Sequence, residues 1–398
     1  MIKKNFDIFL DLGSSRIRAA GFNKGNVDKV IYTEQNCTSF LRIKKIDLTK
    51  TEKEIEKIIL QVEKKTGEYL NNINLMIDSP DAISIGLSLF KVNDGKKINK
   101  NEVQYLIQDA KQQIQKSYPE DNVIHIITTN YKLDENNYNS FPVNESCHKF
   151  SIDLIFICFP KLLIKNLENL FIKHDIIIDQ ILCSSYAKSL HYKEQFVSFD
   201  KVIFIDLGFE KTSIIIYQNE QLKAFNILSL GGNHITKDIS KVLNLDIKTA
   251  EKIKNNLNKN ILFSDKNEDK ENFKEEFLQE FENQDVSLDL IKKIIHARID
   301  EILNLSFEQI TLNEKPLNND NFKIILMGQG SKILNDNSIY IQETTISYDE
   351  IIFFKESGIN ICESGLKLSH GKNKQEVIVI PKKAARTGFF EKLFHLFQ

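Results

Sequence analysis

Residues 8–18 read IFLDLGSSRIR, and residues 202–217, about half a chain further on, read VIFIDLGFEKTSIIIY. In each stretch an apolar strand leads into an aspartate and a glycine turn, and a second strand returns, as in a β-hairpin. The glycine lets the backbone approach a phosphate closely, and the aspartate can orient a hydrated Mg²⁺. Two such units at matching positions predict a duplicated, two-lobed α/β fold that binds one nucleotide between its halves.

A third glycine turn lies further along the chain. Residues 323–331 read KIILMGQGS, a buried strand that ends in a glycine turn. Such a turn can lay its backbone against a base or ribose, although on its own it often serves only chain geometry. Together the three turns give the following predicted nucleotide site, with the two aspartates facing Mg²⁺: Asp11, Gly13, Ser14, Ser15, Arg16, Asp206, Gly208, Lys211, Thr212, Gly328, Gln329, Gly330 and Ser331.

The composition narrows the class of protein. A chain of 398 residues is longer than one core usually serves, so two or more domains are predicted. The formal net charge of −2 gives no support for a broad nucleic-acid-binding surface, and no nucleic acid partner is predicted. The five cysteines are scattered without a C-x-x-C pair, which predicts reduced, mostly buried thiols of a cytosolic protein. We expect neither a signal peptide nor a membrane span, since no stretch reaches roughly 18 apolar residues.

The pattern of elements changes between residues 83 and 157. A strand at 83–89 and a turn at 93–95 lead to Asn99, which is predicted to cap a helix over 102–116. A strand at 123–128, a polar loop through Tyr138 and strands near 150–159 follow, so this segment is predicted to be a compact α+β insertion. Further on, helices are predicted at 162–171, 236–243, 247–257 (capped by Asp246), 288–303 and 358–368.

The order of the three turns resembles the phosphate-1, phosphate-2 and adenosine motifs of the actin-like ATPase superfamily. Within that superfamily the chain resembles the bacterial cell-division protein FtsA family. Residues 231–239 (GGNHITKDI) and 250–254 (AEKIK) are similar to that family's G-G-x-x-I-T-x-D-I and A-E-x-x-K patterns. Residues 123–143 resemble its distinctive insertion, subdomain 1C, and residues 298–302 (RIDEI) its R-x-x-E-I helix. The resemblance implies a two-lobed actin-like fold of duplicated RNase H-like halves, with a 1C insertion and a C-terminal amphipathic helix.

The resemblance also implies ATP and Mg²⁺ as ligands and adds Gly231, Gly232, Glu251 and Lys254 to the nucleotide site. Glu251 and Lys254, three positions apart on one helix, would otherwise be read as an ordinary solvated charge pair. The loop 209–211 (FEK) is bulkier than the small residues usual in the family, and Gln329 interrupts a usual glycine run. Nucleotide binding is therefore expected more than efficient hydrolysis. The catalytic residue stays open, with Asp179, Gln180 and Ser184 as the polar options and surface or capping chemistry as the alternative.

The implied domain boundaries are 1–82 with 158–199 for the first lobe (subdomain 1A), 83–157 for subdomain 1C, 200–234 with 321–368 for the second lobe (subdomain 2A), and 235–320 for subdomain 2B. The closing helix of the second lobe is expected to return toward subdomain 1A. Residues 369–381 are the predicted linker to a membrane-binding helix over 382–398.

The last residues carry an apolar face at helical spacing. The short helix is suited to lie in a bilayer interface, where its basic residues meet anionic headgroups at about 1 kcal/mol each. The alternative is a terminal helix docked on the core of its own protein. The predicted membrane-binding residues are Lys383, Arg386, Phe389, Phe390, Lys392, Leu393, Phe394, Leu396 and Phe397.

The function implied by the resemblance is a peripheral protein on the cytoplasmic face of the cell inner membrane, at the division site. It would assemble head to tail, contact later division proteins, and recruit the tubulin-like protein FtsZ by its C-terminal peptide, with Lys292, Lys293 and Arg298 as candidate contacts. Two alternatives remain. One is a PilM-like type IV pilus assembly protein, which shares the fold, and the other is an actin-fold small-molecule kinase.

Overall fold

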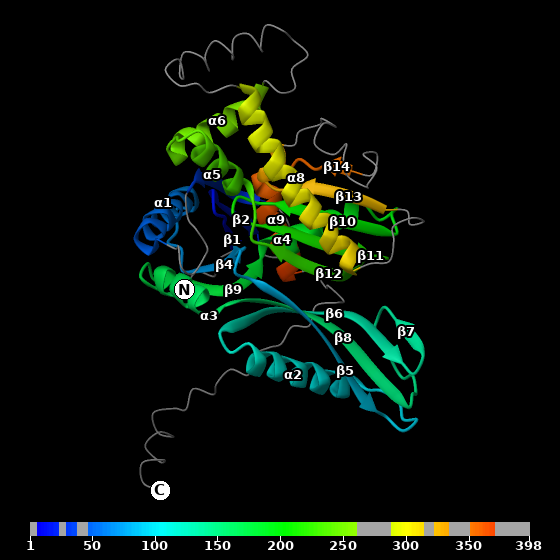
Figure 1. Cartoon of the computed structure of the whole chain (residues 1–398). Helices are drawn as coiled ribbons and strands as arrows, with labels where there is room; N and C mark the ends of the chain where they lie inside the picture. The colour runs from blue at the N-terminus through cyan, green and yellow to red at the C-terminus, as the bar shows by residue number, and fades with distance from the viewer. Residues whose placement is uncertain are drawn as a thin grey trace.

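The computed structural model describes residues 6–23, 29–37, 47–260, 288–313, 322–333 and 351–370. The predicted membrane-binding helix and all of the predicted linker beyond residue 370 lie outside these ranges. The described residues form three sheets, two of which build a two-lobed body while the third projects from it with one helix beneath (Figure 1).

The first lobe contains a five-stranded sheet in the order β3-β2-β1-β4-β9. Strand β1 (Phe6–Leu12) pairs antiparallel with β2 (Arg16–Asn23), which pairs antiparallel with β3 (Lys29–Asn36). On its other side β1 pairs parallel with β4 (Asn72–Ile77), and β4 pairs parallel with β9 (Ile177–Cys183). Parallel strands need cover on both faces, and accordingly β1 and β4 are buried over most of their length, whereas β9 is buried only at its carboxyl end.

The second lobe repeats this arrangement in the order β12-β11-β10-β13-β14. The strands are β10 (Lys201–Leu207), β11 (Thr212–Gln218), β12 (Gln221–Leu228), β13 (Phe322–Met327) and β14 (Ile351–Phe353). The register repeats as well: Asp11 of β1 lies opposite Met76 of β4, and Asp206 of β10 lies opposite Met327 of β13. The duplicated two-lobed α/β fold predicted from the two hairpins is confirmed.

Two helices lie between the sheets. They are α4 (Ser184–Tyr192) and α9 (Gly358–His370), which pack on each other. Although α9 comes last in the described chain, it packs on β1 and β2 of the first lobe (Figure 1). One continuous core therefore joins the inner faces of both sheets, including Phe9 and Met76 from the first and Phe204 and Met327 from the second. The 3₁₀ turn η1 (Lys193–Gln195) follows α4.

The outer faces carry the other helices that the structure describes in the two lobes. Helices α1 (Leu48–Thr66) and α3 (Lys161–Ile172) cover the first sheet, and α5 (Gly232–Val242), α6 (Ile247–Asn260) and α8 (Leu288–Asn313) belong to the second lobe. Asp246 accepts backbone hydrogen bonds from Lys248 and Thr249, so the predicted cap of α6 is confirmed. Helix α8 continues ten residues past its predicted end at Leu303, because Phe307 and Ile310 extend its buried stripe.

The third unit is a sheet in the order β5-β8-β6-β7, packed on α2 (Lys100–Ser117) around its own core. Its strands are β5 (Ile83–Val92), β6 (Asp121–Leu133), β7 (Asn136–Tyr138) and β8 (Lys149–Pro160). Asn99 and Glu102 form a reciprocal capping box at the start of α2, as the predicted cap requires. The polar loop expected through Tyr138 instead contains β7, which pairs with β6. The assignment of these units to named subdomains stays a prediction.

All five cysteines are buried and free, as predicted. Among the helices of the described ranges, none is long and apolar enough to cross a bilayer.

Candidate functional site

Both glycine turns open onto a single cleft between the lobes. In the first, the N–H of Gly13 donates to the carbonyl of Arg16 at 3.0 Å, and in the second the N–H of Gly208 donates to the carbonyl of Lys211 at 2.9 Å. A β-carbon on Gly13 would lie 2.9 Å from the Arg16 oxygen, and one on Gly208 would lie 3.0 Å from the Lys211 oxygen. The two turns thus have the same pattern of hydrogen bonding, and in both the same close contact with a backbone oxygen explains why the residue is glycine.

Three parallel strands of each lobe deliver polar groups to this cleft. In the first lobe, Asp11 lies at the carboxyl end of β1, Asp78 follows β4, and α4 begins directly after β9. In the second lobe the corresponding groups are Asp206 on β10, Gly328 after β13 and Glu356 after β14. The carboxyl ends of parallel strands are the usual ligand edge of an α/β sheet, and here two such edges face each other.

Asp11 is held by groups of its own lobe. Its carboxylate accepts from Arg18 Nη1 at 2.7 Å and from the Ser184 hydroxyl at 2.8 Å. Arg18 lies directly across the hairpin from Asp11 and also lies 3.4 Å from Glu34. Burial alone would lower the pKa of Arg18, but the charge of Asp11 and its hydrogen bond raise it above the ordinary value. Arg18 therefore stays charged beside Asp11.

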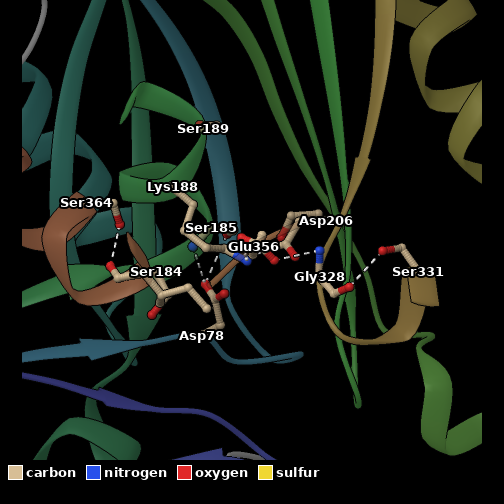
Figure 2. Close-up of polar contacts among 12 residues, drawn as sticks. Asp78, Ser184, Ser185, Lys188, Ser189, Asp206, Gly328, Ser331, Glu356 and Ser364 are labelled. Carbon is tan, nitrogen blue, oxygen red and sulfur yellow. Dashed lines mark hydrogen bonds and ion pairs between the residues drawn. The ribbon is translucent and has the colours of Figure 1, made fainter. Parts of the chain in front are cut away.

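Asp206 is held by a cation from the other lobe. Lys188 Nζ on α4 lies 2.8 Å from Asp206 Oδ2 and 3.2 Å from Glu356 Oε1, and all three side chains are buried (Figure 2). The position across the hairpin from Asp206, equivalent to Arg18, is occupied by the neutral Ser213. The second aspartate thus has its counter-ion across the cleft.

The protonation of this cluster follows from burial and charge. Burial lowers the pKa of Lys188, but the carboxylates of Asp206 and Glu356 outweigh it and raise the pKa above its ordinary value. Burial raises the pKa of Glu356, and the charge of Asp206 adds to the rise while Lys188 opposes it. Glu356 also accepts from the N–H of Gly328 at 2.7 Å. The charges of Lys188 and Asp206 balance, and Glu356 is biased toward its protonated form.

A second contact between the lobes involves Lys211 of the second glycine turn. Lys211 Nζ is 3.3 Å from Asp78 Oδ1 and 3.2 Å from the Ser185 hydroxyl, which itself donates to Asp78 at 3.0 Å. Lys211 also bonds to Ser213 on its own strand. The predicted phosphate-turn lysine is therefore engaged by the opposite lobe.

The cleft contains most of the predicted phosphate-side residues. The predicted residues that line it are Asp11, Gly13, Ser14, Ser15, Arg16, Asp206, Gly208, Lys211, Gly328 and Gln329. The predicted residues that are not among its lining are Thr212, Gly231, Gly232, Glu251, Lys254, Gly330 and Ser331. The cleft has a volume of about 90 Å³, which is small beside the ~300–1,000 Å³ of typical ligand pockets.

The predicted adenosine-side residues pack against the second turn. A β-carbon on Gly231 would lie 2.7 Å from three backbone atoms of residues 208–211, and the N–H of Gly232 donates to the Gly208 carbonyl at 2.9 Å. Lys254 Nζ donates to the Gly232 carbonyl at 3.1 Å and pairs with Glu251 at 2.6 Å. It also lies 5.3 Å over the ring of Phe209. In this closed arrangement these residues support the turn.

The third glycine turn, residues 328–331, is also held by contacts within the protein. Gly328 has a positive φ of 92°, and Ser331 donates its hydroxyl to the Gly328 carbonyl at 2.7 Å. A β-carbon on Gly330 would lie 2.8 Å from Leu207. Thr212 donates its hydroxyl to the Leu230 carbonyl at 2.8 Å.

Four residues that complete the ion pairs were not predicted from the sequence: Arg18, Asp78, Lys188 and Glu356. Asp78 carried a usable signal, because it directly follows a buried strand in the parallel half of the sheet. Lys188 carried a weaker one, a cation four positions after Ser184 on a short helix. Of the three polar options for a catalytic residue, Ser184 reaches the cleft, whereas Asp179 accepts from Asn72 and Gln180 from Ser369, both at exposed sites.

Comparison with known proteins agrees with this architecture. The family model for the cell division protein FtsA matches residues 203–364. The FtsA of Buchnera aphidicola subsp. Acyrthosiphon pisum is 25% identical over 352 residues, covering 83% of this chain and 79% of the relative. The FtsA of Buchnera aphidicola subsp. Schizaphis graminum is 25% identical over 232 residues, covering 58% of this chain and 54% of the relative. The chain is therefore similar in sequence to the FtsA family.

Solved structures show the same fold. A PilM–PilN type IV pilus biogenesis complex chain superposes with a TM-score of 0.62 at 12% identity, covering 91% of this chain and 98% of that one. MreB 5 of Spiroplasma citri bound to AMPPNP superposes with a TM-score of 0.51 at 13% identity, covering 92% and 96%. This chain therefore has the actin-like ATPase fold.

The two glycine turns predicted a hydrated Mg²⁺ oriented by Asp11 and Asp206. Both carboxylates are instead engaged by Arg18 and Lys188. Within the described residues, no cluster of three or more histidine, cysteine, aspartate or glutamate side chains has the arrangement of a metal site. Because both carboxylates already face cations of the protein, the residues present do not fit a divalent cation here.

The predicted FtsZ contacts lie on α8. Lys293 is exposed and Lys292 half-buried. Arg298 donates two hydrogen bonds to the carboxylate of Asp238 on α5, from Nε at 2.5 Å and from Nη2 at 3.0 Å. It also pairs with Glu301. Arg298 therefore fastens α8 to α5, which leaves the two lysines as the simpler candidates for a partner.

Proposed function

We propose that this chain is an actin-like cell division protein that binds ATP between its lobes and tethers FtsZ to the cytoplasmic face of the inner membrane. The observation that carries the proposal is the FtsA family match over residues 203–364, which spans the second glycine turn, the third turn and the first half of α9. The proposal also includes attachment to the membrane through residues 382–398 and head-to-tail assembly of the chain. One short amphipathic helix binds a bilayer only marginally, so many copies in a filament give stable attachment.

ATP is proposed for the cleft because two glycine turns face each other there and basic side chains line it. The lining cations are Arg16, Arg18, Lys188 and Lys211. An actin-like relative of similar fold, MreB 5, carries AMPPNP. Because the closed cleft is too small for a nucleotide, ATP would enter a more open form. Titration calorimetry with ATP on the full chain tests this, and the absence of any binding heat at millimolar ATP would contradict it.

Membrane attachment is tested by liposome co-sedimentation of the full chain and of residues 1–381. We expect the full chain to pellet with vesicles that contain anionic lipid and the truncated chain to stay in the supernatant. A variant with Phe390→Glu and Phe394→Glu keeps the length but breaks the apolar face, so it should also fail to pellet. Equal pelleting of all three proteins would refute the tether.

Binding of FtsZ is tested by fluorescence anisotropy with a labelled FtsZ C-terminal peptide. The double variant Lys292→Ala and Lys293→Ala should weaken binding, since both lysines lie on the proposed 2B surface. Lys116→Ala, an exposed lysine near the end of α2, is the matched control and should bind as the native chain does.

A second candidate is a pilus assembly protein, because the PilM–PilN complex gives the TM-score of 0.62 quoted above. The same anisotropy assay with a peptide from PilN separates the two. Binding of the PilN peptide and not of the FtsZ peptide would favour the pilus function. The FtsA match in sequence favours cell division.

A further inference from the structure

Two ion pairs join the lobes across the cleft, one of them buried and the other partly buried. Lys188 of the first lobe contacts Asp206 of the second at 2.8 Å, and Lys211 of the second lobe contacts Asp78 of the first at 3.3 Å. The side chains of Lys188 and Asp206 are 8% and 5% exposed. Salt screens such buried pairs far less than surface pairs, so they act at physiological ionic strength.

The two halves of the duplication differ in how they neutralise their aspartates. Asp11 has Arg18 directly across its own hairpin, so its charge is balanced whether or not the lobes are closed. Asp206 has the neutral Ser213 at that position and obtains its counter-ion from Lys188 on the other lobe. Opening the cleft therefore separates Asp206 from its cation, while Asp11 keeps its own.

Lys188 also lies within ion-pair distance of a second carboxyl group of the second lobe. Its ammonium lies 3.2 Å from Glu356, whose other oxygen accepts from the N–H of Gly328 at the end of β13. An ammonium has three donors and can serve both carboxyl groups at once. In this way one side chain of α4 connects to the ends of two strands in the opposite lobe (Figure 2).

We propose that Lys188 takes the place of a divalent metal in joining the two lobes, so that the cleft closes without Mg²⁺ and without nucleotide. The proposal goes beyond the function given above and does not depend on it. A metal bridge would need carboxylates free to face it, whereas the carboxylate of Asp206 already faces a buried cation. The closed arrangement of the lobes would then be the resting state of the chain.

The test measures the distance between the lobes in the full chain. Spin labels are placed at Glu68→Cys in the first lobe and Val242→Cys in the second, both exposed. The native cysteines are buried, so these two sites react selectively. The distances between the two spin labels are measured by pulsed electron paramagnetic resonance, first in EDTA without nucleotide and then with ATP and MgCl₂. We expect a single narrow distribution in EDTA. A distribution that is broad or long in EDTA and shortens only with ATP and MgCl₂ would overturn the proposal.

Variants then assign the closure to Lys188. Lys188→Met should broaden the EDTA distribution, whereas Lys173→Met, which removes an ion pair with Glu52 inside the first lobe, should leave it unchanged. The double variant Lys188→Met and Asp206→Asn removes both charges together, so it decides the question even where the single variant does not fold. A folded double variant with the native distribution would show that Lys188 does not hold the lobes. The ATP calorimetry and liposome co-sedimentation that test the proposed function use unlabelled protein. Failure of the lobe-closure proposal in the distance measurement can therefore be told apart from failure of the proposed function.

Discussion

The N–H of Gly328 donates a 2.7 Å hydrogen bond to Glu356, and this contact ties the end of β13 to the segment that leads into α9. Both residues also border the cleft. A single contact thus links the strand order of the second lobe, the path of the chain back to the first lobe, and the charge of the site. Each of these roles can be probed separately.

The first prediction concerns the pH dependence of Glu356. Burial raises its pKa above the ordinary value of 4.5, so the folded state holds its proton after the unfolded state has ionised. Stability from this group is present below about pH 4.5 and is lost as the pH rises toward the folded pKa. Glu356→Gln keeps an acceptor and cannot ionise. Urea unfolding from pH 4.5 to 8 should therefore show the variant gaining stability relative to the native chain as the pH rises. A difference that is flat over this range would contradict the assignment.

The second prediction concerns stability at Lys188. Lys188→Met leaves Asp206 buried without its cation, and removal of one partner from such a pair typically destabilises by about 3–5 kcal/mol. Lys173 and Glu52 form a pair that is 57% and 30% exposed, so Lys173→Met should change the free energy of unfolding by only about 0–1 kcal/mol. Urea unfolding at pH 7 measures both. Equal effects from the two variants would mean that the buried pair contributes no more than a surface pair.

The third prediction concerns the backbone at Gly328. Its φ of 92° disfavours any side chain, and an added β-carbon would lie 2.4 Å from the Leu207 carbonyl oxygen. Gly328→Ala should therefore destabilise by at least about 1–3 kcal/mol, the usual strain of such a conformation. Gly86→Ala on β5 is the control, because a β-carbon there meets nothing within 4 Å. Thermal unfolding of the two variants should differ clearly, with the control at or slightly above the native midpoint.

The fourth prediction concerns the cap of α2. Asn99→Ala removes the side chain that accepts from the N–H of Glu102, which should cost about 1 kcal/mol. Asn101→Ala, on the exposed surface of the same helix, is the matched control. Amide hydrogen exchange in the first turn of α2 should speed up in Asn99→Ala and stay at the native rate in Asn101→Ala. Faster exchange in both would point to a general loosening of the helix.

Local features were predictable because they depend on neighbouring residues. The two hairpins, strand β13 and the cap at Asn99 follow from apolar periodicity and capping residues, and all appear as predicted. The end of α8 was predicted too early, because the stripe of Phe307 and Ile310 was not counted.

The ion pairs of the cleft were not predictable in the same way. Lys188 in isolation reads as a surface lysine on a short helix, and only the packing of α4 between two sheets buries it against Asp206. Glu251 and Lys254 were correctly placed on one helix face, where they contact each other. The spacing of residues on a helix does not reveal which turn that helix face will contact. Here the face contacts the Gly232 carbonyl and the second glycine turn, and neither side chain of the pair lines the cleft.

The position of α9 sets an order for folding. All five strands of the first sheet come from residues before 184, yet the helix packed on β1 and β2 comes from residues 358–370. Gly365 fits so closely that a β-carbon would lie 2.4 Å from the Met76 sulfur and 2.9 Å from Phe9. Domains usually fold as they leave the ribosome, N-terminal first. The first sheet of this chain is an exception: its five strands are synthesised before residue 184, but the face over β1 and β2 receives its covering helix only after residues 358–370 have been translated.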